Sequence, residues 1–365
     1  MVIRVRLFRG GLHYRPAIKL HTAASGLIDQ LDELYLVLEI GKEMAGFGGV
    51  RSNVEYLTGL PASEIEQEIH SRVAGLAWDA PAEKLLDQVH DSVGWSKVAR
   101  ALLDQTLHDT MARQRGQPLA ALLGNDFQPK IETNQTLFWN DDGDMLTLAD
   151  EYVGRGFKDL KLRIGIGPFE HDLRRIAGLR HRFGADIRLS ADVNGQWSFA
   201  AAVSHLQALA PFDLDYIEQP LAAEDWDGLS HLVQLSPMPI MLDESIKSAS
   251  DIDRALELQG PVMAHLKLIK LGGIRPLIEA AKRFTDGGVA VMIGQMNEGA
   301  AATAAAAHCA LAVRSMRNEL YGADGIIDDP AVGLRYDDGF LWLPPGPGIA
   351  LVPDVTKLTL LWENR

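Results

Sequence analysis

Short apolar runs that end in charged residues recur through the middle of the chain at a nearly constant interval. Four of them cover residues 189–194, 216–220, 240–245 and 265–270. The charged residues of these runs lie 26, 25 and 24 residues apart, in the order Asp192, Glu218, Asp243 and Lys267. One strand plus one helix fills such an interval, so the pattern predicts repeated βα units that form a parallel sheet.

The alternation of strand and helix continues from Lys130 over most of the remaining chain. Seven clear strands and a weaker eighth are predicted, in order, at residues 131–139, 159–164, 187–193, 215–219, 240–244, 264–269, 289–294 and 321–327. Helical periodicity fills the gaps between them. Eight such strands favour an α/β fold of the TIM-barrel type. An open doubly wound sheet fits less well, because no glycine-rich phosphate loop follows an early strand.

The two ends of the chain follow other patterns. Near the start, two strand-like runs precede a long stretch with apolar residues at spacings of three and four, which is typical of helices. We therefore predict a small α+β domain over residues 1–127 and the barrel over residues 128–336. Residues 337–365 are too irregular for another βα unit, and we expect this tail to pack back on the first domain.

Composition mainly excludes classes of partner. The formal charge of −14 disfavours a nucleic acid or an anionic membrane surface as a partner. A single cysteine, Cys309, excludes an intrachain disulfide and fits a reducing compartment. The chain shows no signal-peptide pattern and no apolar run of the roughly 18 residues that a membrane helix needs. We expect a cytoplasmic protein that binds a small molecule, and a homo-oligomer is compatible with these features.

Three acidic residues at the ends of successive predicted strands form a candidate metal site. Asp192, Glu218 and Asp243 offer hard oxygen ligands, which suit Mg²⁺ and also Mn²⁺. No histidine or cysteine stands beside them in the sequence, so zinc is disfavoured. Asn194 and Glu244 are available to support the ligands. The alternative is that each acid caps the helix after its strand, but three at one interval favour the metal.

Basic residues at other strand ends are candidates for catalysis. Lys267 ends the strand after Asp243, and Lys161 and Arg163 share one face of an earlier strand. Cations in a barrel mouth would attract an anion and would lower the pKa of a neighbouring lysine, because like charges disfavour protonation. The alternative is that such side chains extend into solvent, which we expect for Lys270.

Taken together, these motifs resemble the enolase superfamily, and within it the muconate-lactonizing-enzyme subgroup of the mandelate racemase/muconate lactonizing enzyme family. The motifs are Lys161-Leu-Arg163, Asp192-Val-Asn194, Glu218-Gln-Pro220, Asp243-Glu-Ser245 and residues 267–273, with further similarity at residues 108–124 and 294–299. The resemblance implies a capping domain over a modified (β/α)₇β barrel. It also implies Mg²⁺ held by Asp192, Glu218 and Asp243, and removal of a proton alpha to a carboxylate by a lysine.

One position departs from the subgroup. Arg163 stands where the second lysine of a Lys-x-Lys motif usually acts as a base, and arginine is effectively always protonated. Two-base racemisation is thereby disfavoured, whereas Lys267 as the one base, together with the metal, suffices for β-elimination or for cycloisomerisation. Lys161 is at most a misplaced helper. We predict dehydration of a hydroxy acid or cyclic amino acid. The alternatives are a racemase or epimerase of an amino acid derivative or dipeptide, a cycloisomerase and, from another class, a non-catalytic anion-binding barrel.

The residues that contact the substrate are predicted from the same resemblance. Two N-terminal loops occupy the positions at which the resembled family closes a lid, and the segment after residue 294 borders the barrel mouth. These segments suggest six substrate-binding residues: His21, Phe47, Arg51, Gln295, Asn297 and Glu298. They do not identify the carboxylate substrate.

Overall fold

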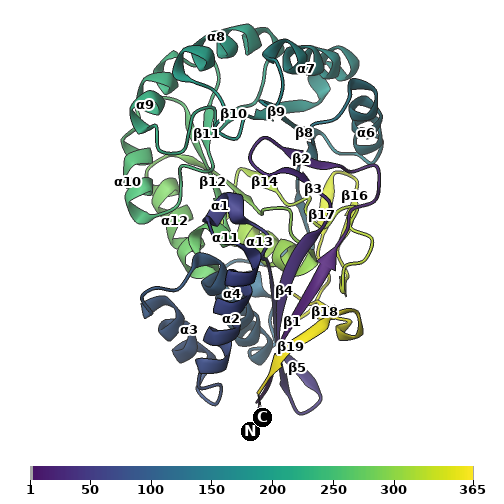
Figure 1. The fold of residues 1–365 in the computed structure, drawn as a ribbon, viewed down its shortest axis with the longest axis vertical. Coiled ribbons are helices and arrows are strands. Elements are labelled where there is room, and N and C mark those ends of the chain that lie inside the picture. The colour runs from purple at the N-terminus through teal and green to yellow at the C-terminus, as the bar shows by residue number, and fades with distance from the viewer. Residues whose placement is uncertain (1–2, 365) are drawn as a thin grey trace.

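Eight parallel strands form a barrel in the upper half of the computed structural model, which describes residues 3–364 (Figure 1). Each strand is hydrogen-bonded to the next in the chain. The strands are β7 (Gln135–Leu137), β8 (Asp159–Arg163), β9 (Arg188–Asp192), β10 (Ile217–Glu218), β11 (Ile240–Leu242), β12 (Val262–Lys267), β13 (Ala290–Gly294) and β14 (Arg317–Glu319). A backbone hydrogen bond of 3.0 Å from Asn134 N to Asn318 O joins the two ends of this sheet.

Helices connect consecutive strands around the outside of the barrel (Figure 1). They are α6 (Asp142–Gly154), α7 (Phe169–Phe183), α8 (Phe199–Leu209), α9 (Trp226–Leu235), α10 (Ala249–Glu257), α12 (Ile274–Asp286) and α13 (Ala300–Val313), with the short α11 (Leu268–Leu271) before α12. Four of them begin at an Asp or Ser whose side chain accepts a backbone N–H of the first turn. The predicted (β/α)₇β barrel is confirmed. In the described part of the chain, no helix is both long and apolar enough to span a membrane.

Two strand predictions were wrong in position. The run at residues 131–139 contains two strands, β6 (Lys130–Glu132), which pairs with β17 (Phe340–Trp342) outside the barrel, and β7. The eighth barrel strand is β14, whereas residues 321–327 form turns and loop. The sequence of β14, Arg-Asn-Glu, lacks the apolar residues by which the other strands are recognised.

The N-terminal domain consists of an antiparallel sheet and a layer of helices. The sheet has the order β19-β1-β4-β5, formed by β19 (Thr359–Glu363), β1 (Ile3–Leu12), β4 (Leu31–Ile40) and β5 (Glu43–Arg51). Its helices are α2 (Ala62–Gly75), α3 (Ala82–Asp91) and α4 (Lys97–Gln114), with the short α1 (Glu55–Thr58) and α5 (Leu119–Leu122). Because β19 pairs with β1, the end of the chain lies beside its start (Figure 1).

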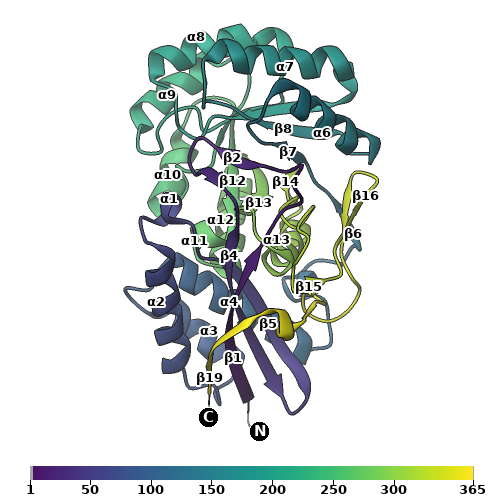
Figure 2. The same cartoon turned by 45° about the vertical axis from the view of Figure 1, so that its right-hand side comes forward.

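The remaining elements are short and lie between the larger ones. They are the hairpin β2 (Leu20–Thr22) and β3 (Gly26–Ile28), the short strands β15 (Ala331–Val332), β16 (Arg335–Asp337) and β18 (Val352–Pro353), and three 3₁₀ turns at Gly184–Asp186, Ala210–Phe212 and Val355–Lys357. The β2–β3 hairpin extends from the N-terminal domain to one end of the barrel (Figure 2). It is anchored there by a backbone hydrogen bond from Trp139 N to His21 O.

A buried aspartate of α4 fastens the N-terminal domain to the barrel. Asp104 accepts hydrogen bonds from the backbone N–H groups of Ile274 and Arg275, at 2.5 and 3.4 Å, and thereby caps the start of α12. Its other neighbours are the imidazoles of His90, with Nε2 at 2.7 Å, and His108, with Nδ1 at 3.2 Å. This contact fixes how the first domain lies on the barrel.

Candidate active site

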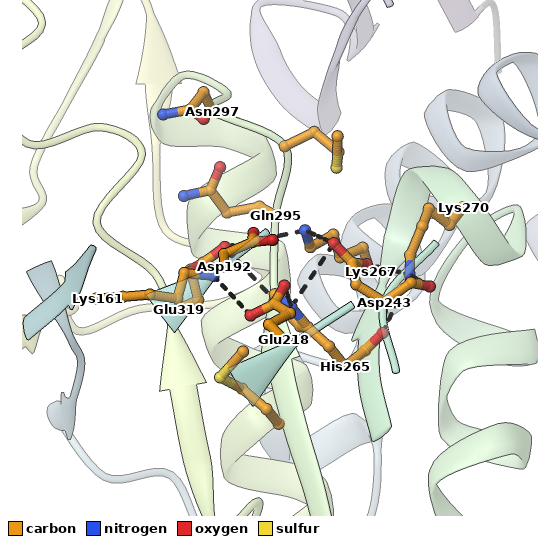
Figure 3. A network of polar contacts seen from close by, with 12 residues as sticks. Lys161, Asp192, Glu218, Asp243, His265, Lys267, Lys270, Gln295, Asn297 and Glu319 are labelled. Atoms are coloured by element: carbon orange, nitrogen blue, oxygen red, sulfur yellow. Dashed lines mark hydrogen bonds and ion pairs between the residues drawn. The ribbon is translucent and has the colours of Figure 1, made fainter. Parts of the chain in front are cut away.

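The charged strand ends converge at one end of the barrel (Figure 3). Asp192 and Glu218 end the neighbouring strands β9 and β10 and are paired in register. Asp243 directly follows β11, and Lys267 ends β12. Active sites of TIM barrels lie at the carboxyl ends of the strands. The interval in the sequence thus corresponds to one shared level in the fold.

The three acidic side chains are buried, with exposed fractions of 0 to 2%, and each contacts a cation. Asp192 accepts a hydrogen bond from Arg163, and Glu218 Oε2 lies 2.9 Å from Lys161 Nζ. Asp243 Oδ2 lies 2.7 Å from Lys267 Nζ. Asn194 donates to Asp192 through both its backbone N–H, at 2.8 Å, and its side-chain amide.

Glu244 lies beside these acids, and the amide of Asn194 donates to its Oε1 at 2.9 Å. Burial, together with the nearby charges of Asp243 and Asp192, raises the pKa of Glu244 to about 8. Burial also raises the pKa of Asp192, to about 7, although Arg163 opposes this shift. Both carboxyls are therefore harder to ionise than solvent-exposed acids, chiefly because they are buried.

The donor set fits a hard divalent cation. Ligand atoms of Glu218, Asp243 and His265 lie within 4.8 Å of one another. Asp192 is linked to this group by Lys161, whose Nζ is 3.8 Å from Asp192 Oδ2 and 2.9 Å from Glu218 Oε2. Buried carboxylate oxygens at this density are what Mg²⁺ and Mn²⁺ bind. Glu218 and Asp243 are close enough to share such an ion, and Asp192 is the candidate third carboxylate.

The pKa of Lys267 is not lowered, contrary to the expectation from its cationic neighbours. Burial lowers it, but the carboxylates of Asp243, Glu319 and Glu218 raise it further. Burial alone would raise the pKa of Asp243, yet Lys267 and Lys270 hold it well below its ordinary value. Opposite charges in direct contact outweigh both burial and like charges at this position.

Lys270 is another correction, because it does not extend into solvent. Its side chain is buried and its Nζ contacts both the backbone oxygen and the carboxylate of Asp243. The reason is local: β12 passes directly into α11, and this short turn of helix directs Lys270 back toward the barrel. Lys270 thus belongs to the charge cluster of the site.

Two buried residues of this cluster, Glu319 and His265, were not predicted from the sequence. Glu319 ends β14 and pairs with Lys161, and its Oε1 lies 3.5 Å from Arg163 Nη2. A signal for it exists: Glu319 lies 52 residues after Lys267, which is two further intervals of the same length. His265 precedes Lys267 by two residues and therefore points to the same interior face of the barrel.

A small cavity of about 30 Å³ separates the charge cluster from the β2–β3 hairpin. Residues of both domains line it. Those from the predicted set are Arg163, Asn194, Asp243, Glu244, Lys267, Arg51, Gln295 and Asn297. Lys161, Asp192 and Glu218 do not line it. Larger hollows, of about 560 and 280 Å³, lie around Arg188 and Glu132 at the opposite end of the barrel.

Three of the predicted substrate-binding residues do not line this cavity. His21 contacts Trp139 edge to face, with ring centroids 5.2 Å apart, because the alternation along β2 directs its neighbours Leu20 and Thr22 into the cavity instead. Phe47 is fully buried where β5 packs against the barrel, and there it stacks on Tyr35. Glu298 is buried and accepts a hydrogen bond from the backbone N–H of Met296.

Arg51 forms part of the cavity wall contributed by the N-terminal domain. It is 1% exposed, its Nε donates to Asn53 Oδ1 at 2.7 Å, and its Nη1 donates to Met296 O at 3.0 Å. Its Nη2 has no hydrogen-bond partner, and within residues 3–364 no carboxylate lies within ion-pair distance of the guanidinium. A buried guanidinium whose Nη2 is unpaired borders the cavity, with Glu298 near enough to feel its charge, and it favours an acceptor group there.

Comparisons with known proteins agree with this geometry. A family model described as Enolase C-terminal domain-like matches residues 144–357. The chain is 31% identical over 321 residues to a hydrophobic dipeptide epimerase of Enterococcus faecalis, covering 86% of this chain and 88% of that protein. It is 29% identical over 323 residues to muconate cycloisomerase 1 of Pseudomonas putida, covering 87% and 85%.

The similarity extends to the fold of the whole chain. The crystal structure of N-succinyl Arg/Lys racemase from Bacillus cereus has a TM-score of 0.90 at 24% identity and covers 100% of this chain and 99% of its own. The dipeptide epimerase from Enterococcus faecalis, complexed with Mg and the dipeptide L-Leu-L-Tyr, has a TM-score of 0.87 at 26% identity and covers 96% and 99%. The chain is therefore an enzyme of the enolase superfamily and belongs to its mandelate racemase/muconate lactonizing enzyme family.

Proposed function

We propose that the enzyme removes the proton alpha to a substrate carboxylate, with Lys267 as the base and a divalent ion, Mg²⁺ or Mn²⁺, held by Asp192, Glu218 and Asp243. The buried oxygen ligands and the similarity to racemases, epimerases and cycloisomerases support this proposal. The Mg in the related dipeptide epimerase structure supports the choice of metal.

Each residue of the site has a separate task in this scheme. A divalent ion held by Asp192, Glu218 and Asp243 would supply positive charge for the substrate carboxylate, and it would weaken the hold of Asp243 on the proton of Lys267. Lys267 takes the alpha proton on its Nζ. The guanidinium of Arg163, which lines the opposite side of the cavity, offers a permanent charge to the substrate anion. Asn194 keeps Asp192 and Glu244 in place.

One observation decides which reaction we favour. Among the described residues, Lys267 is the only lysine that lines the cavity. Lys161 lies beneath it, held by Glu218 and Glu319, so its help is limited to fixing those carboxylates. With a base on one face only, proton removal followed by loss of a β-leaving group is the simplest outcome. This supports dehydration of a hydroxy acid or of a cyclic amino acid.

A racemase or epimerase is the second candidate, because the relatives favour it. The names of the proteins reported above describe racemisation, epimerisation or cycloisomerisation. Under this alternative, inversion needs a proton donor on the face of Arg163, which an always-protonated arginine supplies poorly. The residues of this chain therefore favour elimination, whereas the activities of its relatives favour epimerisation.

Proton NMR in D₂O distinguishes these reactions. The enzyme with Mg²⁺ is incubated with acid sugars, hydroxyprolines, N-acyl amino acids and dipeptides. Loss of the alpha proton together with water supports the dehydratase. Exchange of that proton for deuterium with inversion, at turnover rates, would replace the dehydratase with an epimerase. Metal binding without turnover of any acid in these classes would leave a cycloisomerase and the non-catalytic anion-binding barrel.

A further inference from the structure

The interior of the barrel is apolar just below the charge cluster. A layer of buried apolar side chains fills it, formed by Tyr216, Met241, Met263 and Met292. His265 lies between this layer and the carboxylates, since it points inward with Met263 and Lys267 at alternate positions of β12. It is fully buried. An imidazole here has an apolar layer on one side and the proposed metal ligands on the other.

Among the described residues, the imidazole of His265 makes its one close polar contact with Glu218. Its Nδ1 lies 2.9 Å from Glu218 Oε1, while Lys161 Nζ lies 2.9 Å from Oε2 of the same carboxylate (Figure 3). The two oxygens of Glu218 thus each have a donor, one neutral and one charged. Two donors fix both the position and the rotation of a carboxylate, which one donor cannot do.

The place of the imidazole is also set by shape. Gly294, on the neighbouring strand β13, pairs with Lys267 in register. A Cβ added at Gly294 would overlap His265 Nε2, and it would also come within 3.1 Å of Glu319 Cβ. The φ of Gly294 is not positive, so its backbone conformation does not require glycine. The absence of a side chain at position 294 is what gives the imidazole its room.

We propose that His265 is a positioning residue, whose Nδ1–H orients Glu218 so that the free lone pairs of that carboxylate face the metal ion. This inference rests on the metal-binding role proposed for Glu218. Direct ligation by His265 fits the contacts less well. Nδ1 is the nitrogen near both Glu218 and Asp243, the latter at 3.9 Å, so a metal bond from it would give up the hydrogen bond to Glu218.

The test measures Mn²⁺ binding to the full chain by EPR titration and calorimetry, without reference to turnover. H265L removes the donor at similar volume, and we expect Mn²⁺ affinity to fall about 10- to 100-fold. H265N offers an amide N–H near the place of Nδ1 and should retain affinity close to that of the unchanged enzyme. G294A should weaken binding as H265L does, because it displaces the imidazole while leaving every polar group present.

A double variant sharpens the test. Asparagine has no atom at the position of Nε2, so G294A should cost much less in the H265N background than alone. Where circular dichroism shows that H265L does not fold, G294A and H265N decide the question. Mn²⁺ affinity that is unchanged in G294A and H265L would overturn the role of His265. So would a pulsed-EPR signal from an imidazole nitrogen bound directly to Mn²⁺.

E218Q separates this inference from the function on which it rests. If E218Q loses Mn²⁺ binding but G294A and H265L keep it, the metal site stands and the role of His265 falls. If the unchanged enzyme does not bind Mn²⁺, or if E218Q binds it equally well, the proposed metal site itself falls.

Discussion

Arg163 and Lys161 lie two residues apart on one face of β8, yet only Arg163 lines the cavity. Lys161 is one step further from the end of the strand, and its Nζ contacts Glu218 and Glu319 instead. The strand therefore presents a permanent cation to the cavity and keeps its lysine below. Because β12 lies across the barrel from β8, Lys267 faces Arg163 from the other side.

This arrangement predicts that R163K changes the outcome of the reaction. The variant places a second titratable amine across the cavity from Lys267, where it can return a proton to the opposite face of the substrate. We expect deuterium incorporation with inversion to rise by about tenfold or more, measured by NMR and chiral chromatography in D₂O. R163M, which adds no amine, is the control. Equal inversion in R163K, R163M and the unchanged enzyme would contradict the argument.

Replacement of Lys267 tests the proposed base. Arginine at this position keeps a cation beside Asp243 but does not accept a proton at neutral pH. We expect K267R to lose about 10²- to 10⁴-fold in the rate of alpha-proton exchange, while its unfolding temperature changes little. K282R, on the exposed part of α12, is the matched control. Retention of exchange in K267R would remove Lys267 from the mechanism.

The charged residues at the strand ends could be predicted from the sequence because parallel strands of a barrel end at the same level. Asp192, Glu218, Asp243 and Lys267 could therefore be grouped without knowledge of the fold. Glu319 belongs to the same series of strand ends but was not predicted, since its strand has no apolar residue to mark it. The regular interval between strand ends therefore predicts the position of Glu319, although the hydrophobic pattern around it does not predict a strand.

Other features of the site depend on contacts that a linear pattern does not contain. The face of the sheet on which the side chain of Phe47 lies could not be predicted, because glycines at positions 46, 48 and 49 leave no alternation of apolar and polar residues. The role of His265 could not be predicted either, because it depends on the space that Gly294 leaves on the neighbouring strand. Such pairings are set by packing between strands.

Arg51 predicts an anionic group on the part of the substrate that faces the N-terminal domain. Its Nη2 lacks a partner within the described structure, and truncation of a buried charged contact costs about 2–5 kcal/mol. We expect R51M to raise KM far more than it lowers kcat, and only for substrates with that anion. Steady-state kinetics on a matched pair of substrates, with and without the group, measures this. Equal effects on both would argue for a purely structural Arg51.

The contact between Asp104 and His108 predicts a pH-dependent stability. Burial lowers the pKa of His108, but the Asp104 carboxylate raises it further, above its ordinary value. Burial raises the pKa of Asp104, but both histidines bring it well below its ordinary value. The His108 contribution is therefore complete below about pH 6.5 and is lost as pH rises through the raised pKa. The Asp104 contribution is present above about pH 3.9 and is lost as pH falls through the lowered pKa.

Urea unfolding from pH 5 to 9 checks this prediction. The difference in unfolding free energy between the unchanged enzyme and H108Q should be largest near the acidic end of this range and should shrink toward the alkaline end. H181Q, on the outer helix α7, is the control and should show no such trend. A difference that does not vary with pH would mean that His108 contributes by packing alone.

The close packing of α4 on β5 predicts that a replacement of Gly48 destabilises the protein, whereas a replacement of a glycine with free space around it does not. A Cβ at Gly48 would overlap the Thr106 hydroxyl and come within 3.1 Å of Leu102 O, so α4 has to move away from the sheet. We expect G48A to lower the free energy of unfolding by about 1–3 kcal/mol. G178A is the control: no atom lies within 4 Å of its added Cβ, and alanine in α7 should stabilise by about 0.5–1 kcal/mol. Denaturant unfolding measures both, and a G48A enzyme as stable as G178A would show that the helix and sheet are not in close contact.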